Sequence, residues 1–319
     1  MGSSEGIFPV SVIIVNYNSG IRVSECVASV LRFNPSVEVI VVDNASTDDS
    51  MAQLRAICPV ESRLTVILSD ENRGFSAANN TGVEHAIGQT LLFLNPDCVL
   101  EPDTIDVLLS SLQSDDEVAM VGGLVMNPDG SEQIGARRAI PTPWRTFVKV
   151  TGLNRLSSRY PRLFTDFNLH KQVLPKEPIE VEAISGACML VTREAYDQVG
   201  GMDEEYFLHC EDLDWCMGFR GQGWKILFVP AARLVHYSGS CSKARPVFVE
   251  WHKHKGMVRF YRKFFKHQYP GALMWLVIAG VWLRFGLIVG VLNFKRFVLR
   301  RGRTGKQATS RSVRDEPGR

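Results

Sequence analysis

Short apolar runs alternate with amphipathic stretches along the first hundred residues. The first run, at 10–15, is rich in Val and Ile, and apolar positions then recur at helical spacing over 23–31. The pattern repeats, with further strands expected at 37–42, 64–68 and 91–94 and a short helix at 76–86. Strands that are apolar on both faces and alternate with helices predict an α/β fold with a mostly parallel central sheet flanked by helices.

The pattern changes in the second half of the chain. A helix is expected at 102–112 and a strand at 118–126, while residues 131–182, with five prolines, predict loops and short helices. Further strands are expected at 184–191, 225–229 and 234–236. From there the composition turns basic and aromatic, which predicts two domains, 1–242 and 243–319.

The net charge hides a strong division between these two parts. The chain of 319 residues is 45% hydrophobic and 22% charged, as expected for a globular protein. Residues 243–319 hold 18 Lys and Arg against three acidic residues, a surplus of 15, so the net charge of +2 leaves −13 on residues 1–242. A basic tail on an acidic body indicates an anionic partner, either membrane lipid or nucleic acid.

The cysteines favour a reducing compartment. Seven are present, with no Cys-x-x-Cys pair and no metal-finger spacing, and the odd count leaves at least one unpaired (26, 58, 98, 188, 210, 216 and 241). No basic and then apolar leader opens the sequence, so export is not expected.

One apolar segment in the tail is long enough to cross a bilayer. Residues 271–294 contain a single charge, Arg284, near their centre, and basic residues flank both ends. A central Arg costs at least about 2.5 kcal/mol in a bilayer, and positive charge on both sides favours two cytoplasmic ends. We therefore expect an interfacial or re-entrant helical hairpin at the membrane surface, the alternatives being a simple span or a buried core helix. Nucleic-acid binding is not favoured, because the aromatic residues lie within an aliphatic run.

Polar residues follow four of the expected strands at the point where each strand ends. They are Asn18, Asp43, Arg73 and Asp97. Ligands of open α/β sheets lie beyond the carboxyl ends of the strands, so these side chains are expected to line one crevice. Asp43 is then placed to accept a hydrogen bond from a base or ribose, the alternative being a helix N-cap.

The sequence Asn-Pro-Asp at 95–97 places a carboxylate on a rigid turn. A hard divalent cation that bridges diphosphate oxygens needs one or two such ligands, and His236 could add an imidazole. The alternatives are that Asp97 is an ordinary turn residue and that His236 is structural.

A second acidic site is denser. Glu211, Asp212 and Asp214 fall within four consecutive positions, before an expected helix. Carboxylates held close together repel one another, so at least one should have a raised pKa, which suits proton abstraction near neutral pH. The alternative is a helix N-terminus whose dipole is complemented by acidic residues.

These motifs together resemble family 2 glycosyltransferases of the GT-A fold. They are Val-Ile-Ile-Val-Asn-Tyr-Asn at 12–18, Val-Asp-Asn-Ala-Ser-Thr-Asp at 42–48, Asn-Arg-Gly-Phe at 72–75, Asn-Pro-Asp at 95–97 and Glu-Asp-Leu-Asp-Trp-Cys at 211–216. The resemblance covers about residues 10–240 and is strongest to the bacterial rhamnosyltransferase branch. Members of that branch commonly use dTDP-L-rhamnose as donor and extend a saccharide on a polyprenyl diphosphate at the cytoplasmic face of the inner membrane.

The resemblance assigns roles on the donor side of the crevice. It implies a Rossmann-like sheet that binds a dTDP- or UDP-sugar, with Asn18 in the nucleotide pocket, Asp43 on the base and Arg73 near the diphosphate. Asp97 would bind Mg²⁺ or Mn²⁺ with help from His236.

On the acceptor side, the resemblance makes Asp212 the general base and Glu211 its neighbour. Two positions depart from the family pattern. Asn95, expected to contact the nucleotide sugar, stands where many relatives have an acidic residue. Gly218 stands where a basic residue often follows the acidic cluster, which leaves Arg220 as the candidate substitute.

The reaction that follows is one in-line displacement with inversion, in which cationic groups stabilise the leaving diphosphate and a carboxylate takes the proton of the acceptor hydroxyl. The main alternative is a catalytically inactive nucleotide-sugar-binding scaffold at the membrane, which the two departures support. A sugar nucleotidyltransferase is disfavoured, because residues 16–20 contain no Lys or Arg for a triphosphate.

Overall fold

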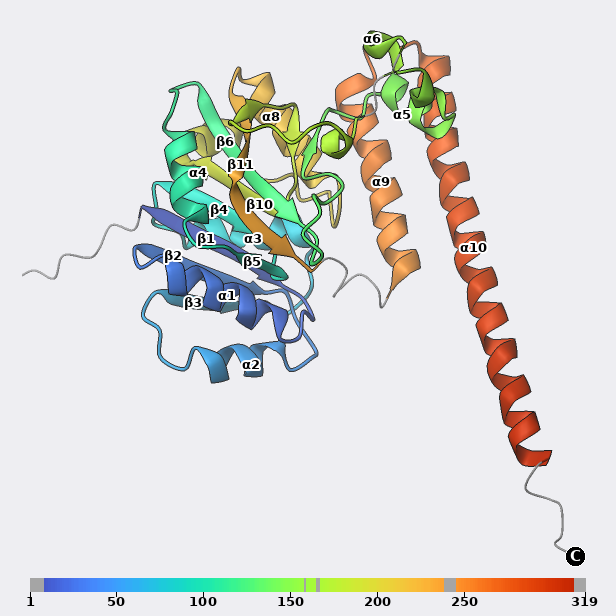
Figure 1. The fold of residues 1–319 in the computed structure, drawn as a ribbon, viewed down its shortest axis with the longest axis horizontal. Coiled ribbons are helices and arrows are strands. Elements are labelled where there is room, and N and C mark those ends of the chain that lie inside the picture. The colour runs from blue at the N-terminus through green and yellow to red at the C-terminus, as the bar shows by residue number, and fades with distance from the viewer. Residues whose placement is uncertain (1–8, 158, 165–166, 238–244, 313–319) are drawn as a thin grey trace, which may run out of the picture. The chain divides into compact units, whose positions relative to one another are not determined.

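The computed structural model describes residues 9–157, 159–164, 167–237 and 245–312 (Figure 1). The chain forms two compact units, residues 1–244 and 245–319. Of the seven cysteines, Cys241 lies outside the described residues.

The first half of the sheet in unit 1 is parallel, as the sequence pattern predicts. Its strands lie in the order β3-β2-β1-β4. Their bounds are Val10–Asn16 for β1, Val37–Asp43 for β2, Leu64–Leu68 for β3 and Thr90–Leu94 for β4. β1, β2 and β4 are buried along their whole length, which explains their continuous Val, Ile and Leu content. The register pairs Asn16 with Asp43, so the two strands end side by side.

The second half makes the sheet mixed rather than mostly parallel. It continues from β4 in the order β10-β6-β11-β5, with β8 also paired to β11. β10 is antiparallel to both β4 and β6, and β5 is antiparallel to β11. The bounds are Cys98–Leu100 for β5, Val118–Met126 for β6, Ile179–Glu180 for β8, Cys188–Thr192 for β10 and Lys225–His236 for β11.

Three expected strands differ from those observed. The run expected at 184–191 is broken at 185–187 into β9, Ala183–Ile184, and β10. The two strands expected at 225–229 and 234–236 are one strand, β11, whose register against β6 shifts between Val229 and Arg233. A bulge lets a strand bend without ending, so the Pro-Ala-Ala-Arg sequence at 230–233 does not break the strand.

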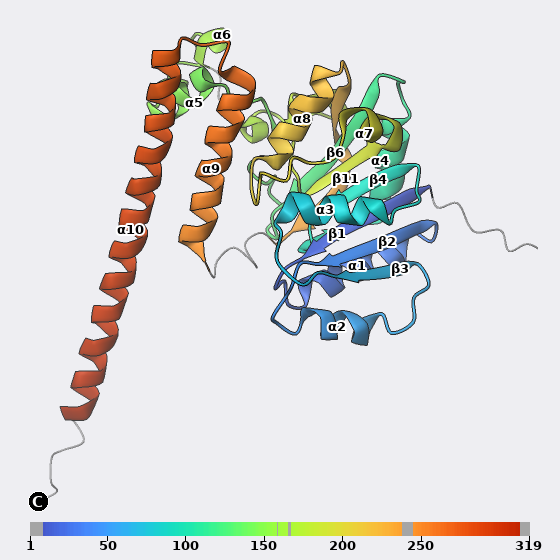
Figure 2. The ribbon, with the colours of Figure 1, turned by 180° about the vertical axis from the view of Figure 1, so that it is seen from behind.

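Helices cover both faces of this sheet (Figures 1 and 2). α1 and α4 lie on one face, and α3, α7 and α8 lie on the other. The bounds are Arg22–Phe33 for α1, Ser50–Ile57 for α2, Phe75–Glu84 for α3, Thr104–Leu112 for α4, Arg193–Val199 for α7 and Glu211–Gly221 for α8.

The weakly patterned middle segment consists of short elements, as expected. They are β7 at Arg137–Arg138, which pairs with β9 in a separate two-stranded sheet, α5 at Pro143–Val150, η1 at Leu153–Leu156, α6 at Pro161–Phe164 and η2 at Leu169–Lys171.

Unit 2 consists of two helices, α9 at Pro246–Phe265 and α10 at Gly271–Ser312. α10 is uninterrupted, so the hairpin expected within residues 271–294 is wrong. The hairpin is formed instead by α9 and α10, which pack through Trp251 and Trp282, with ring centroids 5.2 Å apart. Arg284 lies 3.3 Å from Nε2 of the buried His254, so its charge has a polar neighbour and does not require a break in the helix. Residues 271–295 have a mean hydropathy of 2.1 and are long enough to cross a membrane. Only 6% of this apolar segment is buried within the described residues, so it is not a buried core helix.

Candidate active site

Asparagine side chains join the loops that follow the first three strands. Asn18, in the left-handed region at φ 53°, accepts hydrogen bonds from the backbone of Thr47 at 2.7 Å and Asp48 at 3.2 Å. Asn44 donates to Asn72 Oδ1 at 2.9 Å and accepts from the backbone of Arg73 at 3.1 Å. The expected crevice residues from these loops are therefore gathered at one edge of the sheet.

Asp43 is held rigidly at the end of β2. Its carboxylate accepts from Asn16 Nδ2 at 2.7 Å and from the backbone N–H of Ser46 at 3.2 Å, and the residue is buried. The helix that follows begins at Ser50, with Asp49 before it, so Asp43 is not its N-cap. The capping alternative is wrong.

Arg73 lies on the outer side of the same edge. Its side chain is 53% exposed, and its guanidinium pairs with Glu204 at 3.3 Å, a contact that solvent weakens. The next residue, Gly74, has φ 92°, and a Cβ there would lie 2.7 Å from the carbonyl oxygen of Phe207. Loop 72–75 therefore packs closely on the segment that leads into α8.

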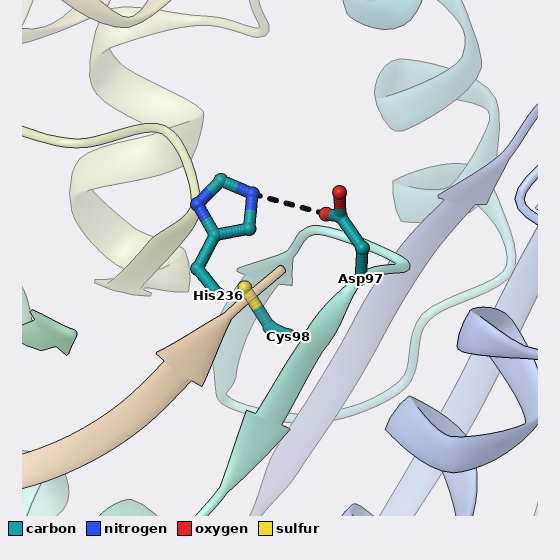
Figure 3. Close-up of side chains that lie close together, drawn as sticks. All are labelled: Asp97, Cys98 and His236. Atoms are coloured by element: carbon teal, nitrogen blue, oxygen red, sulfur yellow. Dashed lines mark ion pairs between the residues drawn. The ribbon is translucent and has the colours of Figure 1, made fainter. Parts of the chain in front are cut away.

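Asp97 and His236 form an ion-pair contact at the end of the antiparallel strands β5 and β11 (Figure 3). Asp97 Oδ1 lies 3.0 Å from His236 Nε2, and both side chains are largely buried. His236 Nδ1 lies 2.7 Å from Gln133 Oε1, and since an amide oxygen can only accept, Nδ1 is the donor. Nε2 then faces Asp97 Oδ1, and the two atoms can share a proton or a cation between them. Asn95 Nδ2 is 3.4 Å from the same Nε2.

These donors suit a divalent cation. Two ligands in adjacent positions of an octahedral ion with bonds of about 2.1 Å are about 3 Å apart, which matches the Asp97–His236 separation. The carboxylate oxygen suits Mg²⁺ or Mn²⁺, and the imidazole nitrogen beside it favours Mn²⁺ over the harder Mg²⁺. Cys98 Sγ lies within 4.8 Å of both ligand atoms, but its nearest acceptor is the carbonyl oxygen of Ala187 at 3.5 Å.

The acidic cluster begins α8 after two strained residues. His209 and Cys210 have φ of 68° and 75°, which is uncommon for residues with side chains and is often found at functional sites. The three carboxyl groups have different environments. Asp214 accepts from Tyr206 Oη at 2.8 Å, and Asp212 is ion-paired with Arg138. Glu211 Oε2 is buried without a hydrogen-bond partner among the described residues.

Burial, and next the charge of Asp212, raise the pKa of Glu211 to about 8. The expectation that one carboxyl group of this cluster has a raised pKa is confirmed. The raised pKa favours the protonated form of the buried Glu211 near neutral pH, while the neighbouring Asp212 is ion-paired with Arg138.

The sequence analysis missed Arg138. Its guanidinium reaches Asp212 and donates to the carbonyl oxygen of Ile184 at 3.0 Å, while its Nε is buried and unpaired among the described atoms. It comes from β7, more than 70 residues before Asp212, and no local motif identified it. Arg220 does not take this role, because it is exposed in the last turn of α8, while Asp212 is in the first. A Cβ on Gly218 would lie 3.0 Å from Val199, which makes position 218 a packing position.

The break between β9 and β10 connects the two acidic positions. The backbone N–H of Asn95 donates to Ala187 O at 3.0 Å, and the backbone N–H of Gly186 donates to Asp212 Oδ2 at 3.2 Å. A side chain at position 186 would lie 3.1 Å from the Cβ of Asp212. Residues 185–187 therefore hold the turn 95–97 and Asp212 in one region of the fold. The absence of a side chain at Gly186 thus allows the close approach of Asp212.

Comparison with known families agrees with this arrangement. The family model described as glycosyl transferase family 2 matches residues 11–200, more than half of the chain. The chain belongs to this family. It is a glycosyltransferase, as the motifs predicted.

The relatives of this family 2 glycosyltransferase include rhamnosyltransferases. N-acetylglucosaminyl-diphospho-decaprenol L-rhamnosyltransferase of Mycobacterium tuberculosis is 27% identical, over 92% of this chain and 95% of that protein. Rhamnosyltransferase WbbL of Escherichia coli K12 is 26% identical, over 72% of this chain and 83% of that protein.

Solved structures of low sequence identity share the fold of this family 2 glycosyltransferase. GalNAc-T7, solved with UDP, GalNAc and Mn²⁺, has a TM-score of 0.58 at 19% identity, over 81% of this chain and 48% of that one. The mannosyltransferase PcManGT of Pyrobaculum calidifontis, solved with GDP-Man and Mn²⁺, has a TM-score of 0.55 at 17% identity, over 96% and 80%. The GT-A fold predicted from the motifs is confirmed.

Proposed function

We propose that this glycosyltransferase moves L-rhamnose from dTDP-L-rhamnose, with inversion, to a saccharide carried on a polyprenyl diphosphate. The mechanism rests on two hydrogen bonds made by residues 185–187. Ala187 accepts from the backbone of Asn95, beside Asp97, and Gly186 donates to the carboxylate of Asp212, so both carboxylates belong to one region. The choice of donor and acceptor is supported by the similarity to the decaprenol-linked rhamnosyltransferase over 92% of the chain.

Donor binding is assigned to the edge of the sheet formed by β1 to β4. Asp43 would accept from the base and Asn18 would line the nucleotide pocket, since both belong to the joined loops. Arg73, exposed at this edge, would exchange its weak contact with Glu204 for the donor diphosphate. Asn95, whose side chain lies beside His236, would contact the nucleotide sugar near its diphosphate.

Asp97 and His236 would hold Mg²⁺ or Mn²⁺. The bound ion would neutralise charge that develops on the departing diphosphate. Gln133 would fix the tautomer of His236, because accepting the Nδ1 proton leaves Nε2 available to the ion.

Asp212 would take the proton of the acceptor hydroxyl. The environments of the two adjacent carboxyl groups separate their protonation states, and such a difference is how a site assigns the acid and the base. The raised pKa of the buried Glu211 favours its protonated form, so Asp212, which faces the guanidinium of Arg138, would be the carboxylate that accepts the proton. Arg138 and the N–H of Gly186 hold its oxygen in place. The hydroxyl oxygen would then attack the anomeric carbon as the bond to the diphosphate oxygen breaks, so one displacement inverts the centre.

Membrane association would bring the enzyme to its acceptor. The apolar helix α10 and the basic residues of unit 2 favour the cytoplasmic face of a bacterial inner membrane, where anionic lipid attracts basic segments.

Product analysis tests the proposal. The full-length protein is incubated with dTDP-L-rhamnose, a panel of UDP-sugars and a polyprenyl-diphosphate-linked N-acetylglucosamine, with Mn²⁺ or Mg²⁺ added. Mass spectrometry should show the addition of one deoxyhexose, and NMR of the product should show the inverted anomeric configuration. Transfer from a UDP-sugar alone would replace the proposed donor, and no turnover with any donor would favour the scaffold function.

A further inference from the structure

One surface of unit 1 is both apolar and exposed. The segment 143–164, which we call the basic aromatic surface, contains α5, η1 and α6. Five large side chains on it are 43–57% exposed: Trp144, Phe147, Leu156, Tyr160 and Leu163. Isolated exposed apolar residues are common, but five within 20 consecutive residues indicate a contact surface.

The basic aromatic surface is ordered by its own contacts. Thr142 caps α5 by accepting from the backbone of Arg145 at 3.2 Å, and the fully buried Val148 anchors the inner side of the helix. The indole N–H of Trp144 donates to the carbonyl oxygen of Leu163 at 2.8 Å, which joins α5 to α6. The rings of Trp144 and Phe147 stack, with centroids 5.7 Å apart. The apolar side chains therefore point outward from a built surface.

The charge of this segment is opposite to that of the rest of unit 1. Residues 133–165 contain seven Lys and Arg and no Asp or Glu, although residues 1–242 as a whole carry −13. Four of these basic residues belong to the basic aromatic surface itself: Arg145, Lys149, Arg155 and Arg159. Basic residues interleaved with Trp, Tyr, Phe and Leu complement the interface of an anionic bilayer, where the rings enter the headgroup layer and the cations meet phosphates.

This surface is fixed to the site. Arg138, which contacts Asp212, precedes α5 by five residues, so no more than about 18 Å of chain separates them. Glu182 holds the connection, since it accepts from the backbone of Ile140 at 2.6 Å and pairs with Arg145 at 2.5 Å. A bilayer in contact with the basic aromatic surface would therefore lie close to the proposed base.

We propose that the basic aromatic surface docks on an anionic phospholipid bilayer. This is a second membrane contact, made by the catalytic unit and distinct from α10. It sets the position of the Asp212 side of the site relative to the headgroups. The inference does not depend on which sugar is transferred or on which lipid carries the acceptor.

Lipid photolabelling of the full chain tests this docking. The protein is reconstituted into vesicles of phosphatidylcholine and phosphatidylglycerol that contain a phospholipid with a headgroup diazirine, and labelled peptides are mapped by mass spectrometry. We expect label in residues 143–164 and none in residues 50–63. The latter region also carries exposed apolar residues, Ile57 at 48% and Val60 at 97%, and so provides a matched control.

Two double variants extend the test. Trp144→Glu with Phe147→Glu should reduce labelling of 143–164 at least fivefold and raise the KM for a polyprenyl-linked acceptor in vesicles, with activity on a short-chain, water-soluble acceptor unchanged. Ile57→Glu with Val60→Glu should change none of these. Replacing phosphatidylglycerol by phosphatidylcholine should also reduce the labelling.

Equal labelling of both regions, or labelling of 143–164 that survives the first double variant, would overturn the proposal. So would crosslinks from 143–164 to residues 271–294, because the surface would then be covered by the chain itself. Labelling does not require turnover, so a wrong donor or acceptor would leave this result intact, and the two proposals can fail separately.

Discussion

The two acidic positions of this enzyme differ in the partner that each has in the fold. Asp97 faces the imidazole of His236, whose other nitrogen is held by Gln133. Asp212 faces the guanidinium of Arg138. The first pair presents an oxygen and a nitrogen lone pair to the same point and suits a metal ion. The second already contains its own cation, so it suits a carboxylate that must stay ionised until a proton arrives.

The partner of each carboxylate, rather than the carboxylate itself, thus separates the two kinds of chemistry. Both partners are brought in from distant segments, and residues 185–187 hold the two pairs together. This comparison can be tested by exchanging or removing one partner at a time, beginning with the carboxylates.

The largest effect is expected for Asp212→Asn. An amide cannot take the acceptor proton, so kcat should fall about 10³-fold, within the range for loss of a general base. Binding of the donor, measured by calorimetry with Mn²⁺ present, should be unchanged. Full activity in this variant would remove Asp212 from the mechanism.

Asp97→Asn should reduce kcat/KM about 100-fold, equivalent to about 3 kcal/mol of transition-state stabilisation. Here, in contrast to Asp212→Asn, donor binding should no longer strengthen when Mn²⁺ is added. Calorimetric titration with and without the metal separates the two variants, and an Asp97→Asn protein that keeps its metal response would show that the ion lies elsewhere.

Arg138→Met should lower kcat about 30-fold and leave the KM for the donor unchanged, since Arg138 acts through the position of Asp212. Arg138→Lys keeps the charge and should recover part of the rate. Without the positive charge of Arg138, the carboxyl pair is protonated more easily. As the pH is lowered, the kcat of the Met variant should therefore begin to fall at a higher pH than the kcat of the native protein. A lower rate with an unchanged pH profile would indicate a purely structural role.

Gln133→Leu removes the acceptor of the His236 Nδ1 proton. Loss of such a partner typically weakens metal affinity 10- to 100-fold, and we expect about 10-fold, measured as the Mn²⁺ concentration that gives half-maximal rate. At saturating Mn²⁺ the rate should return to that of the native protein. Gln133→Glu is the matched control, since it keeps an acceptor oxygen.

The smallest effect on rate is expected for Glu211→Gln, which replaces a protonated carboxyl group by a neutral one of similar shape. Its main consequence concerns stability. Between the ordinary pKa of 4.5 and the raised value of about 8, the folded protein holds a proton that the unfolded chain has released. The free energy of unfolding of the native protein should therefore fall as pH rises through this window, by at most about 1.4 kcal/mol per pH unit from this group. In urea unfolding at pH 5 to 8, the free energy of unfolding of Glu211→Gln should depend less on pH than that of the native protein. An equal pH dependence in both proteins would show that the raised pKa belongs to another group.

The sequence predicted the strands of the parallel half well, because β1, β2 and β4 are buried on both faces and must be apolar throughout. It did not reveal that the other half is mixed, with β10 antiparallel to β4 and β6 and β11 parallel to β6. The strand expected at 184–191 is interrupted at Gly186, where the backbone approaches Asp212, and no local pattern reports that approach. The bulge that keeps β11 continuous depends on pairing with β6, which is also not local.

Chain composition and motif order by themselves determined the family, the parallel core and the identity of the two acidic positions. The reason is that buried strands require apolar residues and the loops after them require polar ones, and both are visible in the local sequence. Only the tertiary structure decided what each carboxylate is paired with: Asp97 with His236, and Asp212 with Arg138. The reason is physical, since the protonation and ligand preference of a carboxyl group depend on charges and solvent within a few ångströms, and folding brings those from segments far away in the chain.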